Sequence, residues 1–248
     1  MQTRIDHVVG GIYRISSWSD DYGITFNQFL IDDECPTLVH TGNYDEYEHV
    51  RATVREVLDP ATLAHVVLLH WEGDENGGMD RFLAEAPQAE LIGSALSIQL
   101  NAHGFGVHNR VRGFTDGEAL ELGSHTLRFL ETPHVHHWDS MMVVEESTRS
   151  LFPSDLYIQP GDQPPIVTEN LSEPMLEIYR GSGIFGHENP VRSTVRRIDA
   201  LDPEWVHPMH GGSFTRAELP TYSRALRENE FAYRGMLLFR ELEAAPVG

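Results

Sequence analysis

The chain has 248 residues and a formal net charge of −20, and all 18 of its basic residues are arginine. This charge argues against nucleic acid or an anionic membrane as partner, and without lysine neither a Schiff base nor a lysine-based phosphate loop can form. Cys35 is the only cysteine, which excludes a disulfide within the chain and any cysteine-ligated zinc, iron–sulfur or rubredoxin centre within it.

No apolar run reaches the roughly 18 residues that a membrane span requires. Residues 1–6 also lack the apolar core of a signal peptide. We therefore expect a cytoplasmic protein that acts in solution.

The first half of the sequence alternates between β-prone and helical segments. Apolar residues at helical spacing over 46–58 end at Asp59-Pro60, and a strand over 62–69 leads into a Gly-rich loop. This order predicts a sheet that is covered by helices. The predicted strands are 11–16, 25–31, 37–40, 62–69 and 91–92, and the predicted helices are 46–58, 79–86 and 95–101.

From residue 110 to 152 the pattern changes to short strands with alternating apolar side chains. Three prolines and one glycine within 157–168 predict a loop that directly follows Asp155. Further on, the sequence predicts helices over 173–179, 191–201 and 218–239, and a short strand at 205–206.

The segment that follows strand 62–69 has the composition of a metal site. Side chains on a strand alternate faces, so His70, Glu72 and Asp74 would point the same way while the strand persists. An imidazole with nearby carboxylates suits borderline-to-hard divalent ions. The alternative explanation is an acidic surface loop in an acidic chain.

Three later segments each place a metal-ligating residue type after a β-prone or apolar run. They contain His136 (within 132–141), Asp155 (within 151–155) and His210 (within 207–212). With the first motif they give the order His-x-Glu-x-Asp, His, Asp and His-Gly, in which every donor is an imidazole or a carboxylate.

This order resembles the metallo-β-lactamase superfamily, and more narrowly its di-iron branch, which includes the cores of flavodiiron proteins and stand-alone oxygen-binding di-iron proteins. Glu72 is the discriminating residue, because the hydrolase branches usually have histidine there. The segment from His136 to Met141 is similar to the flavodiiron pattern in which Asp-Ser-Met closely follows a ligand histidine.

The resemblance covers nearly the whole chain and implies an α/β (α+β) fold, the four-layer αββα metallo-β-lactamase sandwich. It implies a single domain over residues 1–248 with two αβ halves, about 1–117 and 118–248, and a site at their shared edge. Its ligand set, carried over to this sequence, is His70, Glu72 and His136 on metal one, Asp74 and His210 on metal two, and Asp155 as the bridge.

Glu75 departs from the family pattern, which has a further metal-two histidine at this position. Three interpretations stay open: Glu75 ligates metal two, it orients a water or a histidine from behind the ligands, or it is solvated while the site holds one metal. In the last case His70, Glu72 and His136 form a two-histidine, one-carboxylate set, which is a mononuclear iron pattern.

Three further residues are candidates for contacts behind the ligands. Asp139 is close enough in sequence to orient His136. On a strand, His134 would share a face with His136 and His137 would not. His40 stands near the end of an early strand, where the superfamily often has an aspartate that hydrogen-bonds into the site. A purely structural role is the alternative for both His134 and His40.

The donor set favours iron over zinc, because extra anionic ligands oppose the lowering of a bound water's pKa toward ~7 that a zinc hydrolase needs. The resemblance thus implies a di-iron protein without haem that binds, activates or reduces O2, with NO as the alternative to O2. Zinc and manganese are the alternative metals. A flavodoxin domain does not fit into this length, so a flavin could bind only at a dimer interface, and a homodimer is itself implied by the resemblance.

The sequence leaves the electron source open. An external donor could supply the electrons, the protein could sense oxygen, or a small organic substrate could be oxidised by an oxidase or oxygenase reaction. The second hypothesis is a binuclear zinc hydrolase acting on an ester, lactone or thioester. The third is a metal-free binding module.

Overall fold

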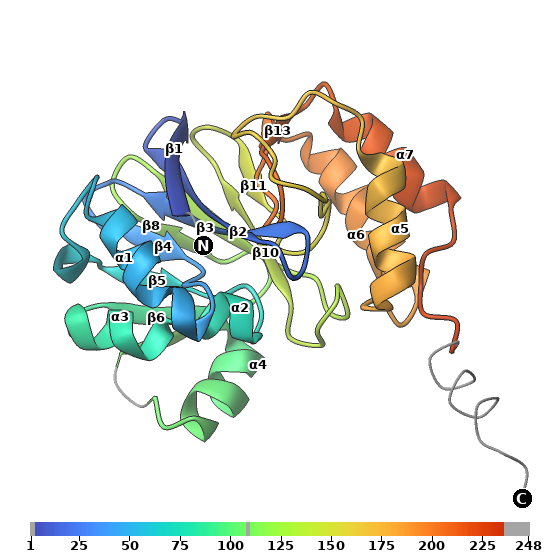
Figure 1. Ribbon diagram of the computed structural model, residues 1–248. Coiled ribbons are helices and arrows are strands. Elements are labelled where there is room, and N and C mark those ends of the chain that lie inside the picture. Colours follow the sequence, from blue (N-terminus) through green and yellow to red (C-terminus); the bar gives the residue numbers. More distant parts are fainter. Residues whose placement is uncertain (1–2, 108–109, 236–248) are drawn as a thin grey trace, which may run out of the picture.

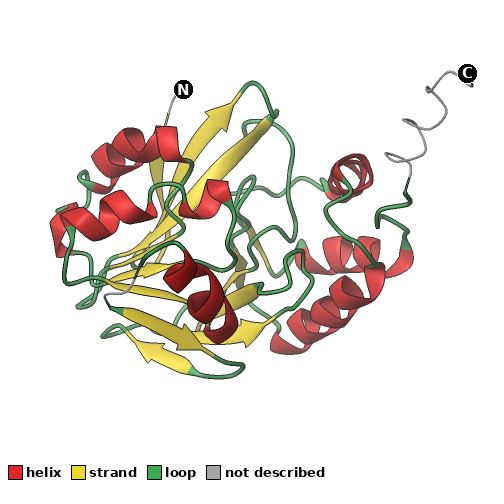
Figure 2. Ribbon diagram, turned by 90° about the horizontal axis from the view of Figure 1, so that it is seen from below, coloured by secondary structure: helices red, strands yellow, loops and turns green. Residues whose placement is uncertain are grey.

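Two β-sheets pack face to face at the centre of the molecule, and helices cover the outer face of each sheet (Figure 1). The structure, a computed structural model, describes residues 3–107 and 110–235. Figure 2 shows the helices as outer layers on either side of the strands. The helices are α1 (Tyr47–Val54), α2 (Gly73–Asn76), α3 (Met79–Glu85), α4 (Ala95–Ser97), α5 (Ser172–Ser182), α6 (Glu188–Leu201) and α7 (Leu219–Glu228).

The first sheet has seven strands in the order β1-β2-β3-β4-β5-β6-β7. Its first four strands pair antiparallel, and β4 to β7 pair parallel. The parallel part places the carboxyl ends of β4 and β5 at the same edge. The strands are β1 (Thr3–Val9), β2 (Ile12–Ser19), β3 (Ile24–Ile31), β4 (Thr37–Val39), β5 (His65–Val67), β6 (Glu90–Ser94) and β7 (Val111–Phe114).

The second sheet has six strands in the order β13-β12-β11-β10-β9-β8. All pairs are antiparallel except β11 with β12, which run parallel. The strands are β8 (Ala119–Glu121), β9 (Thr126–Glu131), β10 (Met141–Glu145), β11 (Ser150–Phe152), β12 (Trp205–Val206) and β13 (Phe214–Thr215).

The core has three layers, and adjacent residues of one strand serve two of them. Val66 on β5 packs outward against α1 and α3, whereas Val67 packs inward against side chains of the second sheet such as Phe129 and Phe152. A third cluster joins the outer face of the second sheet to α5, α6 and α7. Period-two alternation on strands that are buried on both faces therefore produces the predicted αββα sandwich.

Several element boundaries differ from the sequence-based expectation. Helix α1 ends at Val54, strand β5 covers only His65–Val67, and the expected helix over 95–101 is the short α4 followed by a π-helical turn over Ile98–Ala102. The expected helix over 218–239 is α7, which ends at Glu228, and residues 236–239 lie outside the described part of the chain. The sequence analysis did not predict β1 or β13. None of the helices in the described ranges is long and apolar enough to cross a membrane.

Candidate metal centre

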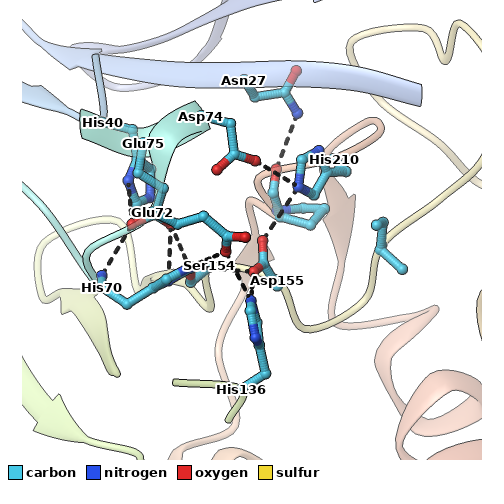
Figure 3. Close-up of polar contacts among 12 residues, drawn as sticks. Asn27, His40, His70, Glu72, Asp74, Glu75, His136, Ser154, Asp155 and His210 are labelled. Carbon is cyan, nitrogen blue, oxygen red and sulfur yellow. Dashed lines mark hydrogen bonds and ion pairs between the residues drawn. The ribbon is translucent and has the colours of Figure 1, made fainter. Parts of the chain in front are cut away.

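The seven residues predicted as ligands lie in loops and a short helix at one edge of the sandwich. His70 and Glu72 follow β5, and Asp74 and Glu75 lie in α2. His136 comes from the loop between β9 and β10, Asp155 follows β11, and His210 follows β12. Figure 3 shows that six of these side chains converge, while Glu75 lies behind His70 beside His40.

The first group of donor atoms surrounds one oxygen of Glu72. Its Oε2 atom lies 2.9 Å from His70 Nε2 and 3.0 Å from His136 Nε2. Oδ2 of Asp155 lies 2.8 Å from the same His136 nitrogen and 3.5 Å from His70 Nε2. Two imidazoles and two carboxylates thus present their donor atoms to one small volume.

The second group lies on the other side of Asp155. Nε2 of His210 is 3.2 Å from Asp155 Oδ1 and 3.6 Å from Asp74 Oδ2. Asp155 therefore faces the first group with one oxygen and the second group with the other. A carboxylate in this position can bridge two metal ions.

The local backbone that produces this arrangement is not the strand that the sequence suggested. β5 ends at Val67, residues 70–72 are irregular, and Asp74 lies in the first turn of α2. Glu72 and Asp74 consequently reach different nitrogen groups instead of sharing one strand face.

The loop at residues 132–140 also differs from the expected strand. Because it consists of turns and bends, the alternation argument fails there. The rings of His136 and His137 lie 4.5 Å apart and both approach His70. The side chain of His134 is exposed. His137, which the strand alternation had placed on the opposite face, therefore forms a potential metal-binding group with His70, Glu72 and His136.

Hydrogen bonds behind the imidazoles turn their Nε2 atoms toward the donor groups. Nδ1 of His210 lies 2.9 Å from the carbonyl oxygen of Thr25, which can only accept, so Nδ1 carries the proton. The hydroxyl of Ser154 donates to Glu75 Oε1 at 2.7 Å, which leaves its oxygen to accept from His70 Nδ1 at 2.9 Å. Both rings then direct Nε2 toward the donor groups, and this nitrogen can bind a metal once its proton is displaced.

Glu75 is fully buried and its carboxylate lies on the Nδ1 side of His70. Its Oε2 atom accepts from the His70 amide at 3.0 Å and lies 3.2 Å from His40 Nδ1. Its Oε1 atom lies 3.1 Å from His70 Nδ1. The solvated alternative for Glu75 is therefore excluded by its burial, and His40 contacts it directly.

Asp139 is buried and lies closer to His137 than the sequence argument assumed. Its Oδ1 atom is 3.8 Å from His137 Nδ1, and its Oδ2 atom accepts from the Asn101 side chain at 3.3 Å. The expected contact between Asp139 and His136 is not found among the described residues. The imidazole that Asp139 approaches is that of His137, the residue after His136.

The carboxylates create a field that favours positive charge at this edge. Burial opposes the charged form of His70, yet Glu75, Asp155 and Glu72 raise the pKa of His70 to about 10. The pKa values of His136 and His210 are raised to about 9 against the same opposing burial, chiefly by Asp155. Burial raises the pKa of Asp74 to about 6. A divalent cation satisfies the same field and displaces these protons.

The residues present therefore fit a metal. In the described part of the chain, the buried oxygens Oδ1 of Asp74 and Oδ1 of Asp155 have no hydrogen-bond partner. Buried polar atoms normally have hydrogen-bond partners, so two carboxylate oxygens without one, beside imidazoles, are suited to bind a cation. Imidazole and carboxylate donors without thiolate suit iron, manganese or zinc.

Two side chains from the first sheet hold the loop that carries His210. The Asn27 amide donates to the carbonyl oxygens of Pro208 at 3.0 Å and Gly211 at 2.7 Å. The buried guanidinium of Arg14 donates to the same Gly211 oxygen at 2.8 Å. These contacts connect β2 and β3 to the second half of the chain, and the sequence analysis did not find either residue.

A cavity of about 560 Å³ opens onto both donor groups. Its floor includes Asp74, His136, Asp155 and His210. Its walls are largely apolar, and the loop over 157–168 contributes to them. The apolar wall residues are Ile24, Phe26, Ile158, Pro160, Ile178 and Ile184.

The chain also matches a family model and several known proteins. The model of a family described as "ODP family beta lactamase" matches residues 24–211, a range that contains all seven predicted ligands. The rubredoxin-oxygen oxidoreductase of Megalodesulfovibrio gigas is 27% identical over 214 residues, covering 81% of this chain and 52% of that protein. The chain spans about a third to a half of the length of the curated relatives it matches.

Solved structures show the same fold. The rubredoxin oxygen:oxidoreductase from the anaerobe Desulfovibrio gigas has a TM-score of 0.83 at 20% identity, covering 91% of this chain and 61% of that one. The apo chemotaxis sensor ODP from T. denticola has a TM-score of 0.77 at 18% identity, covering 93% of this chain and 96% of that one. The predicted metallo-β-lactamase-like architecture is thereby confirmed.

Proposed function

Because this chain belongs to the ODP beta-lactamase family, within the di-iron branch of the metallo-β-lactamase fold, we propose that it holds two iron ions and binds, activates or reduces O2 or NO. The observation that best supports the proposal is the position of Asp155. Its two oxygens contact His136 on one side and His210 on the other, at 2.8 and 3.2 Å. This is the relationship that a bridging carboxylate requires.

The proposed ligands are divided between two positions. His70, Glu72 and His136 belong to the first position, Asp74 and His210 belong to the second, and Asp155 is shared. Glu75 is assigned the orienting role, because its contacts are with His70, His40 and Ser154.

Iron, when bound, supplies the redox chemistry that O2 and NO need. The chain's own residues prepare the site for it. Thr25 and Ser154 fix the tautomers of His210 and His70. The carboxylates supply negative charge that stabilises oxidised iron, and the largely apolar wall of the cavity suits an uncharged diatomic ligand.

Iron is preferred to zinc because of the donor charge. A zinc hydrolase works by lowering the pKa of a metal-bound water toward ~7, and each added carboxylate weakens that effect. The carboxylates of Glu72, Asp74 and Asp155 are all among the donors, and the carboxylate of Glu75 lies directly behind His70. Manganese is a further alternative, and zinc is the competing metal in the test below.

The electron source distinguishes two uses of such a site. Two of the matched proteins are an oxidoreductase and a chemotaxis sensor. For this chain we propose either a separate electron donor or a small organic reductant in the cavity of about 560 Å³, with oxygen sensing as the use that needs no turnover. A homodimer is part of the proposal on the strength of the flavodiiron resemblance.

The test is anaerobic loading with Fe²⁺, followed by measured addition of O2 or NO. We expect uptake of the gas and a change in the visible absorption of the protein, neither of which the Zn²⁺-loaded protein shows. Hydrolysis of a thioester or lactone by the Zn²⁺-loaded form, together with no response of the Fe²⁺-loaded form to either gas, would favour the hydrolase hypothesis.

A further inference from the structure

We propose that His137 supplies an additional imidazole to the first metal position, so that three histidines hold the ion there together with Glu72. The inference rests on the proposed function in one respect, since it requires that a metal binds at this position. It concerns a residue that the resemblance does not assign to the metal.

Three imidazole nitrogens converge on one oxygen. The Nε2 atoms of His70, His136 and His137 lie 2.9, 3.0 and 3.8 Å from Glu72 Oε2. Donor atoms about 2.1 Å from one ion lie roughly 3.0 Å apart at right angles and roughly 4.2 Å apart when opposite. The separations of 2.9 and 3.0 Å match the right-angle value, the separation of 3.8 Å lies between the two values, and the four donor atoms lie within 4.8 Å of one another.

A buried carboxylate stands behind His137. Oδ1 of Asp139 lies 3.8 Å from His137 Nδ1, and in the described part of the chain this oxygen has no hydrogen-bond partner. Asp139 is only 4% exposed. A carboxylate or carbonyl behind Nδ1 is the usual arrangement for an imidazole that binds a metal through Nε2. His70 and His210 likewise have an oxygen behind Nδ1, from the Ser154 hydroxyl and the Thr25 carbonyl, each at 2.9 Å.

The backbone of the loop holds His137 in this place. The His137 amide donates to Ser140 Oγ at 3.0 Å, and its carbonyl accepts from the His134 amide at 2.7 Å. The ring is half-buried and lies 4.7 Å from that of His70. The loop thus presents two consecutive imidazoles to Glu72, which a strand could not do.

The assignment of His137 to the first metal position also accounts for the carboxylate of Glu75 at the site of a family histidine. The family has a metal-two histidine at that position, whereas here the carboxylate is directed to the Nδ1 side of His70. The second position therefore keeps Asp74, His210 and the shared Asp155, while the first gains His137. We expect two metal-binding steps of unequal affinity, with the stronger step at the first position.

The experiment is an anaerobic titration of the full chain with Co²⁺, which reports coordination through its visible absorption. His137→Phe keeps a ring and removes the nitrogen donors. We expect the first Co²⁺ to bind at least tenfold more weakly and with an altered spectrum, because changes merely behind a ligand already cost about 10- to 100-fold. Asp139→Asn should weaken the same step by a smaller factor.

His134→Asn is the matched control. It lies in the same loop, its side chain is exposed, and asparagine tolerates the positive φ of 66° found there. We expect wild-type titration curves. Melting temperatures of the metal-free proteins verify that each variant folds, and His137→Gln replaces His137→Phe if the phenylalanine variant does not.

The outcomes separate the two proposals. If the wild-type protein binds Co²⁺ and the folded His137 variant binds it with the same affinity and spectrum, then His137 is not a ligand and this inference is wrong, while the metal site stands. If the wild-type protein binds no Co²⁺ at all, the proposed metal function fails and takes the inference with it.

Discussion

Glu75 and His70 meet on the side of the imidazole ring that faces away from the donor groups. Oε1 of Glu75 is 3.1 Å from His70 Nδ1, whereas Nε2 of the same ring points at Glu72 from 2.9 Å. Burial disfavours the charged form of Glu75, but the neighbouring His40 and His70 rings hold its pKa below the ordinary value. A carboxylate in this place orients the ring and makes it a stronger donor.

Replacement of Glu75 by glutamine should therefore weaken the metal position that contains His70. The amide oxygen of glutamine can still accept from the His70 amide, so the fold is kept while the charge is lost. We expect about a tenfold loss of affinity in the first step of a Co²⁺ titration. Selective loss of the second step would instead show that Glu75 ligates metal two directly.

Asp155 and Asp74 should differ in how many ions depend on them. Asp155 contacts both donor groups, whereas the contact of Asp74 is with His210 of the second group. We expect Asp74→Asn to retain about one tightly held ion per chain and Asp155→Asn to lose affinity at both positions. Metal analysis after gel filtration measures this difference. Equal metal content in the two variants would contradict the bridging role of Asp155.

His207 should make the metal-free fold sensitive to acid. Burial lowers the pKa of His207 to about 3, and its two ring nitrogens contact Ser213 Oγ and Ser150 Oγ. In the unfolded chain its pKa returns to about 6.5. Below that pH the unfolded state takes up a proton that the folded state does not, so this contribution to stability is lost as pH falls from about 6.5 toward 3.

Urea unfolding at pH 7, 6 and 5 tests this effect. The free energy of unfolding should fall more steeply in the wild-type protein than in His207→Gln, with a difference of up to about 1.4 kcal/mol per pH unit. Substitution of the exposed His49 by glutamine is the control and should leave the slope unchanged. Parallel curves for wild type and His207→Gln would show that His207 does not control the acid sensitivity.

Alanine substitution of the two glycines at the ends of α2 should change the free energy of unfolding by different amounts. A Cβ atom on Gly77 would lie 2.3 Å from the Tyr44 amide nitrogen and 2.7 Å from the Asn43 carbonyl carbon, both backbone atoms. A Cβ atom on Gly73 meets nothing within 4 Å. We expect Gly77→Ala to lower the free energy of unfolding by about 1–3 kcal/mol and Gly73→Ala to change it by less than about 1 kcal/mol. Chemical denaturation of the metal-free proteins measures both free energies of unfolding. An unchanged free energy of unfolding in Gly77→Ala would contradict the tight packing of α2 against residues 43–44.

Local patterns in the sequence predicted a sheet covered by helices and the chemical types of the donors, whereas the four-layer αββα arrangement was implied by the family resemblance. The apolar run Val66 to Leu69 leads into His70 and Glu72 at a sheet edge, and the short strands before His136, Asp155 and His210 end at that same edge. The structure brings these segments together. Whether they bind metal as assigned stays a prediction.

The parts that the sequence could not predict depend on contacts between distant residues or on turns. The Thr25 carbonyl contacts His210 Nδ1 from 185 residues away in the sequence, and the Asn27 amide donates to Gly211 of the same loop from 184 residues away. The burial of Glu75 has no local signal, because its neighbours are polar and glycine residues. The turn at 132–140 breaks the strand alternation, and with it the argument that placed His137 on the opposite face from His136.

The most direct test of the di-iron proposal is the metal content of protein expressed with iron and zinc both available, measured by mass spectrometry. Anaerobic reduction and exposure to O2, followed by absorbance, complete the measurement. We predict about two iron ions per chain and a spectrum that changes when O2 is added. Two zinc ions per chain and no spectral response to O2 would contradict the proposal.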